Sequence, residues 1–133
     1  MTLRQQIVEA HIEKTMAKLG VPADKSFLIF AHSVFTDKSI HSFNPNDNVD
    51  GGQDKQLDAI TIEDSNDEAT IYITQIKKEE TFSSNCTIQI RNGLQWLFEK
   101  RIADIEELSN IKFKDKIKDY RKIQSDLGPS NIY

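Results

Sequence analysis

The chain opens with apolar residues that recur about once per helical turn between residues 3 and 19. Gly20 and Pro22 follow directly, and both residue types commonly end helices. Ser26 has a side chain that can cap a second, shorter helix, whose dense apolar residues begin at Phe27. Two consecutive helices are therefore predicted for the N-terminal part of the chain.

A change of pattern follows at residues 36–56, which are dense in Asn, Asp, Gly and Pro. These residue types favour turns, so the stretch is predicted to be a long loop. Residues 57–63 and 69–77 are then rich in strand-forming residues and are separated by a short acidic segment typical of a turn. The two segments are predicted to form a β-hairpin.

Helical spacing returns in the last third of the chain. Ser83, Ser84 or Asn85 can cap a long helix that runs to about residue 109, and a last helix is expected over residues 112–126. The final residues, SNIY, begin to resemble a further strand. The pattern predicts an α+β or α/β fold, in which a short central sheet is flanked by about four helices.

Three residues whose side chains could take part in a reaction converge if the hairpin closes symmetrically. Paired positions then add up to 133, so Asp58 lies across from Gln75 and their side chains share one face of the sheet. Lys77 shares that face, because alternate residues of a strand point to the same side. A register shift of one residue would separate the three side chains.

An acid, an amide and an amine in one place suit metal-assisted hydrolysis of a phosphodiester. Mg²⁺ or Mn²⁺ can take oxygen ligands from Asp58, from the Gln75 amide and from a backbone carbonyl. Lys77 would hold the attacking water or offset charge that develops on the phosphate. Glu9, on the first predicted helix, is a further candidate acid. Taken alone, the same residues fit a structural role, with Asp58 closing a turn and Lys77 ending a strand in water.

Longer stretches around these residues resemble a known family. They are VDGGQDKQLDAITI at residues 49–62, IYITQIKK at residues 71–78 and FSSNCTIQIRNGLQWLF at residues 82–98. All three are similar to the N-terminal region of the AIPR, or abortive phage infection, family. The resemblance spans about residues 27–120 and implies a restriction-endonuclease-like core of the PD-(D/E)xK type.

The resemblance also implies roles for particular residues. The strand aspartate of such a core matches Asp58, and its acid-x-Lys strand matches Gln75, Ile76 and Lys77, so that Asp58, Gln75 and Ile76 would bind the metal. Gln in place of the usual Glu also occurs in Mrr-type relatives and removes one negative charge from the site. Asp54 also matches the family's sequence pattern, and the resemblance implies that it shapes the loop.

The function implied is that of a Mg²⁺-dependent endonuclease domain in a bacterial phage-defence protein. The alternative is a catalytically inactive nuclease-fold module that binds nucleic acid or a protein partner. The resemblance implies full-length members several times longer than these 133 residues. Residues 1–133 are therefore expected to form a single nuclease-like domain from the N-terminal part of a longer protein.

Composition limits these possibilities. No apolar run is long enough to cross a bilayer, and the N-terminus is unlike a signal peptide, so a cytoplasmic protein away from membranes is expected. The net charge of −4 argues against a strongly basic nucleic-acid binder. Residues 81–133 nevertheless hold 9 Lys and Arg against 7 Asp and Glu.

The C-terminal half is therefore the better candidate for contact with phosphate. Lys112, Lys116 and Arg121 are the candidate residues for binding DNA or RNA, although a solvated helix face is the alternative interpretation of the same charges. An exposed SNIY strand at a sheet edge would also allow a homodimer.

Overall fold

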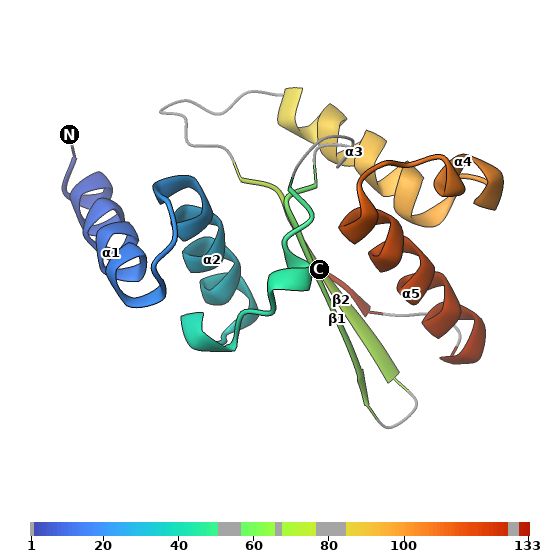
Figure 1. Ribbon diagram of the computed structural model, residues 1–133, viewed down its shortest axis with the longest axis horizontal. Helices are drawn as coiled ribbons and strands as arrows, with labels where there is room; N and C mark the ends of the chain where they lie inside the picture. The colour runs from blue at the N-terminus through green and yellow to red at the C-terminus, as the bar shows by residue number, and fades with distance from the viewer. Residues whose placement is uncertain (1, 51–56, 66–67, 77–84, 128–130) are drawn as a thin grey trace. The chain divides into compact units, whose positions relative to one another are not determined.

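The computed structural model describes residues 2–50, 57–65, 68–76, 85–127 and 131–133 (Figure 1). These residues pack as two compact units, Met1–Asn44 and Pro45–Tyr133. The first unit is helical, and the second contains a sheet with helices packed against it. The chain thus has a mixed α+β fold.

Two helices and a short 3-10 turn make up the first unit: α1 (Leu3–Leu19), α2 (Ala23–Thr36) and η1 (Ile40–Ser42). The predicted bounds of the first helix are confirmed. The helix begins with a capping box, in which Thr2 and Gln5 each accept a hydrogen bond from the other's backbone N–H. It ends at Gly20, whose φ of 66° is readily adopted by a residue without a Cβ atom.

Ser26 does not cap the second helix as predicted. The helix begins at Ala23, after Pro22 in an extended conformation, and Ser26 lies inside it, fully buried. Its hydroxyl donates a hydrogen bond of 2.6 Å to the backbone carbonyl of Ile12 on α1. The serine therefore joins the two helices, since a buried hydroxyl needs a partner and a helix carbonyl can accept a second bond.

The second unit begins with a short 3-10 turn and continues through strands and helices: η2 (Pro45–Asp47), β1 (Ala59–Ser65), β2 (Glu68–Thr74), α3 (Asn85–Phe98), α4 (Ile102–Glu106), α5 (Ile111–Leu127) and β3 (Asn131–Ile132). The predicted long loop thus includes the turns η1 and η2. Asn48 also forms an isolated antiparallel bridge with Ala59. The last predicted helix is confirmed to within one residue at each end.

The hairpin has the predicted register. Ala59 pairs with Thr74, and the pairing continues without a shift to Ser65 and Glu68. The strand bounds differ from those predicted: β1 begins two residues later and ends two residues later, and β2 ends at Thr74. The register is nevertheless the feature on which the predicted convergence of side chains depends.

A third strand joins this hairpin, as the C-terminal sequence suggested. Within the described residues the sheet has the order β1-β2-β3, and β3 runs parallel to β2. The Ile73 N–H donates to the Tyr133 carbonyl at 2.8 Å, and the Tyr133 N–H donates to the Ile71 carbonyl at 2.9 Å. The Tyr133 ring also stacks on Tyr72, with centroids 5.6 Å apart. Helices α3, α4 and α5 form the crossover between the parallel strands, the usual way of joining such a pair.

The single long helix predicted up to about residue 109 is wrong, because the chain breaks between α3 and α4. The N–H groups of Glu99 and Lys100 both donate to the Gln95 carbonyl, which closes the end of α3. Arg101 is then extended and begins α4 as its N-cap residue. The apolar stripe continues across the break, which explains why the pattern alone indicated one helix.

The core of the second unit lies between the hairpin and these helices. Figure 1 shows α3, α4 and α5 gathered on one side of β1 and β2. The strands and the segment before them contribute Leu57, Ile60 and Ile71, all fully buried. The helices contribute Leu97, Ile105, Phe113, Ile117 and Tyr120, each at most 1% exposed.

No helix in the described parts of the chain is both long and apolar enough to span a bilayer.

A matched pair of substitutions on α5 tests this core. Ile117→Ala removes a fully buried side chain and should lower the free energy of unfolding by about 2–5 kcal/mol. Ile111→Ala makes the same change where the side chain is 60% exposed, and should cost at most about 0.5 kcal/mol. Urea denaturation followed by circular dichroism measures both. Equal losses would show that the buried face of α5 has been assigned incorrectly.

Candidate metal and nucleic-acid site

Asp58 lies directly before β1 and joins three segments of the second unit. Its N–H donates to the Thr74 carbonyl at 2.9 Å, and its carbonyl accepts from the Val49 N–H at 3.1 Å. The carboxylate atom Oδ2 accepts from the backbone N–H of Ile76 at 2.7 Å. The side chain is half-buried and is held toward the residues that follow β2, Gln75 and Ile76.

Gln75 directly follows β2 and continues the row formed by Ile71 and Ile73, which pack on the core. Its side chain is half-buried, and the amide Nε2 donates to Oε1 of Gln89 at 3.3 Å. Gln89 lies on α3, so this bond joins the end of the sheet to a helix. The sequence analysis did not single out Gln89, although it falls within residues 82–98, one of the stretches considered there.

The structure therefore brings together three of the predicted site residues: Asp58, Gln75 and Ile76. Lys77, predicted to complete the set, lies outside the described residues, as does Asp54. Glu9 lies on α1, in the first unit, with a half-buried side chain. Its role as a further acid stays a prediction.

The donor set fits a hard divalent cation by atom type. The Asp58 carboxylate, the Gln75 amide oxygen and the Ile76 carbonyl are all oxygen ligands, which Mg²⁺ and Mn²⁺ prefer. A carboxylate can accept about four hydrogen bonds or ligand contacts, so the bond from Ile76 is compatible with coordination. One carboxylate supplies one negative charge, so modest affinity is expected. Within the described residues, no group of three or more His, Cys, Asp or Glu side chains could hold a metal.

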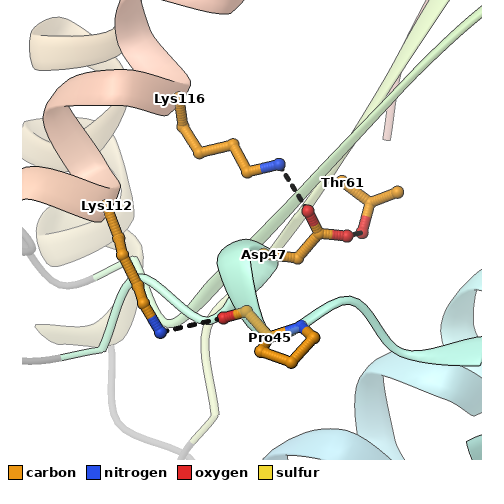
Figure 2. A network of polar contacts seen from close by, with 5 residues as sticks. All are labelled: Pro45, Asp47, Thr61, Lys112 and Lys116. Atoms are coloured by element: carbon orange, nitrogen blue, oxygen red, sulfur yellow. Dashed lines mark hydrogen bonds and ion pairs between the residues drawn. The ribbon is translucent and has the colours of Figure 1, made fainter.

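Two of the predicted phosphate-binding lysines bind the chain itself. Figure 2 shows Lys116 of α5 in an ion pair with Asp47, whose other carboxylate oxygen accepts from the Thr61 hydroxyl at 2.8 Å. The Lys116 and Asp47 side chains are only 13% and 10% exposed. Lys112 donates to the Pro45 carbonyl at 3.0 Å. Both lysines thus attach the turn η2 to α5.

Arg121, the third predicted phosphate ligand, is bound at the end of α3. Its guanidinium donates to the carbonyls of Trp96 at 3.1 Å and Leu97 at 3.2 Å. Carbonyls in the last turn of a helix have no partner within the helix, and a cation there also complements the helix dipole. Burial lowers the pKa of the Arg121 guanidinium. The ordinary pKa of a guanidinium lies so far above neutral pH that Arg121 stays charged there.

Two further lysines of α5 pair with a half-exposed acid. Lys114 and Lys118 both pair with Glu106 on α4, at 3.4 and 2.5 Å. The hydrogen bond from Lys118 is the main reason that the pKa of the Glu106 carboxyl is lowered. Most cations of α5 therefore have partners within the second unit, and a phosphate path along this helix stays a prediction.

No family model matches the chain at a significant level, and neither does any curated protein sequence or solved structure.

The buried ion pair predicts a large effect of one lysine and a small effect of another. Lys116→Met would leave the Asp47 carboxylate buried without its cation, and should lower the free energy of unfolding by about 3 kcal/mol. Lys118→Met, two residues along α5, removes an exposed pair and should cost at most about 1 kcal/mol. Chemical denaturation measures both. Adding Asp47→Asn to Lys116→Met should recover part of the loss, and a further loss in that double variant would contradict this account.

Proposed function

We propose that this chain is the nuclease-like domain of a bacterial phage-defence protein of the AIPR type, and that it hydrolyses phosphodiester bonds in DNA or RNA. The observation that carries the proposal is the hairpin register, which brings Asp58 to the end of β2 beside Gln75 and Ile76. The resemblance of three sequence stretches to the AIPR family supports the same function. The proposed setting is the cytoplasm.

In this proposal Asp58, the Gln75 amide oxygen and the Ile76 carbonyl hold Mg²⁺ or Mn²⁺. When bound, the cation would supply Lewis-acid activation of water and of the phosphate. The hydrogen bond from the Ile76 N–H orients the Asp58 carboxylate before any ligand arrives, which reduces the cost of arranging the site. Lys77 would position the attacking water or offset negative charge on the phosphate.

The finer fold assignment, a restriction-endonuclease-like core, belongs to the same proposal. Its support is the arrangement of an antiparallel hairpin whose second strand pairs in parallel with a strand that follows the helices. Strand β3 lies at an edge of the described sheet, with Ile132 half-exposed. Pairing of two copies along this edge is the proposed basis of a homodimer.

A second function, from a different class, is a non-catalytic module that binds nucleic acid or a protein partner on the same scaffold. Gln75 is the observation that favours it, because an amide replaces the usual acid and already donates to Gln89. Asp58 also has a structural bond to Ile76. Both contacts would hold the scaffold together without a cation.

Asp58→Asn tests the nuclease proposal with little damage to the fold. Asparagine keeps an oxygen that can accept from the Ile76 N–H but removes the negative charge, so metal binding should fall sharply while stability changes little. Calorimetric titration with Mg²⁺ and Mn²⁺ measures metal binding, and an assay on mixed DNA and RNA substrates measures cleavage. Asp64→Asn, at an exposed position on the hairpin, is the matched control and should behave like the parent.

The possible outcomes separate the two functions. Cleavage that is lost in Asp58→Asn and kept in Asp64→Asn supports the nuclease. Equal cleavage by the parent and Asp58→Asn would show that the site is assigned incorrectly. Binding of nucleic acid without metal and without turnover in the parent would favour the non-catalytic module.

A further inference from the structure

Helix α1 has two different sides. The side that contains Ile12 and Thr15 is buried in the first unit, where α1 packs against α2. The opposite side is exposed but carries two large apolar residues, Leu3 at 71% exposure and Ile7 at 50%. Both belong to the periodic apolar residues that predicted this helix, so the helix has more apolar residues than its contact with α2 buries.

The exposed side has the spacing of a coiled-coil seam. Five exposed residues follow one another at intervals of four, three, four and three positions: Leu3, Ile7, Ala10, Lys14 and Ala17. Apolar residues at the a and d positions of a coiled coil repeat in this way. The neighbouring e and g positions of α1 are exposed as well, whereas its b, c and f positions are buried or half-buried. The whole seam is therefore accessible to a second helix.

The charges beside the seam favour one arrangement of two identical helices. Glu13 has a g position and Lys18 an e position, and both are exposed. In a parallel pair in register, each g residue lies near the e residue five positions later in the other helix, so Glu13 meets Lys18 of the second copy twice. An antiparallel pair places e positions together, and those of α1 are Arg4, His11 and Lys18, with no acid among them.

We infer that the seam on α1 is a docking surface for a second copy of this chain, which binds through its own α1 in a parallel pair. The capping box and the packing against α2 already hold α1 as a helix, so association does not bear the cost of forming it. Lys14 at an a position and the short length of the seam make the association weak, and a lysine there also favours a defined register. The seam belongs to the first unit, so it is a different surface from β3 and from the proposed metal site.

Substitution of Ile7 tests whether the seam carries the association. Sedimentation of the full chain over a range of concentrations should show a mass that rises from monomer toward dimer. Ile7→Lys places a charge inside the seam and removes two buried isoleucines from the pair, so the association constant should fall by about tenfold or more. Val34→Lys makes a matched change on α2, where the side chain is 66% exposed, and should associate like the parent. Circular dichroism checks that both variants are folded.

An exchange of charges tests the parallel orientation. Glu13→Lys alone and Lys18→Glu alone each place like charges beside the seam, and each should weaken association several-fold at low salt. A mixture of the two variants restores an opposite charge in both pairs, so it should associate more tightly than either variant by itself. A folding defect cannot produce this recovery.

Each outcome supports or overturns the docking surface. A parent that stays monomeric at every concentration overturns it. A dimer that Ile7→Lys does not weaken overturns it too, and points to the edge of β3 instead. A mixture that associates no better than the single charge variants excludes the parallel pair on which the docking surface depends. Loss in Ile7→Lys, retention in Val34→Lys and recovery in the mixture support it.

Discussion

The antiparallel pairing of β1 with β2 is the constraint on which the second unit depends. Side chains alternate between the faces of a strand, so the register decides which residues are buried under α3 and α5 and which polar groups meet at the strand ends. A shift by one residue would turn the side chains of the shifted strand, Ile60 on β1 or Ile71 on β2, away from the core and would separate Asp58 from Gln75. The same pairing therefore specifies both the packing and the candidate chemistry.

Side-chain bonds to backbone carbonyls complete this arrangement where regular structure ends. Asn110 donates to the Val49 carbonyl at 2.9 Å and accepts from the Phe113 N–H at 3.1 Å, so it holds the segment before β1 and also caps the start of α5. Arg121 binds the last carbonyls of α3. Such bonds satisfy groups that would otherwise be buried without partners, and they fix the helices relative to the sheet.

Sequence patterns predicted the elements whose evidence is local. Helix α1 has a clear period and a glycine at its end, and the hairpin register follows from two strand-like segments around a short acidic stretch. Patterns failed where distant residues decide the outcome. Arg121 of α5 binds carbonyls near the end of α3, next to the break after Phe98, and Ser26 bonds to another helix rather than to its own helix end. Neither contact leaves a signal in the spacing of apolar residues.

The residues of the candidate site were likewise predicted only where the evidence is local. Asp58 and Gln75 could be paired from the sequence because a hairpin relates their positions by a simple rule. Gln89 could not, since its approach to Gln75 depends on how α3 packs on the sheet. Lys116 was counted among the cations available for phosphate because its burial against Asp47 involves residues far apart in the chain. Charge along a helix thus indicates how many cations are present, and tertiary structure decides how many of them have partners within the protein.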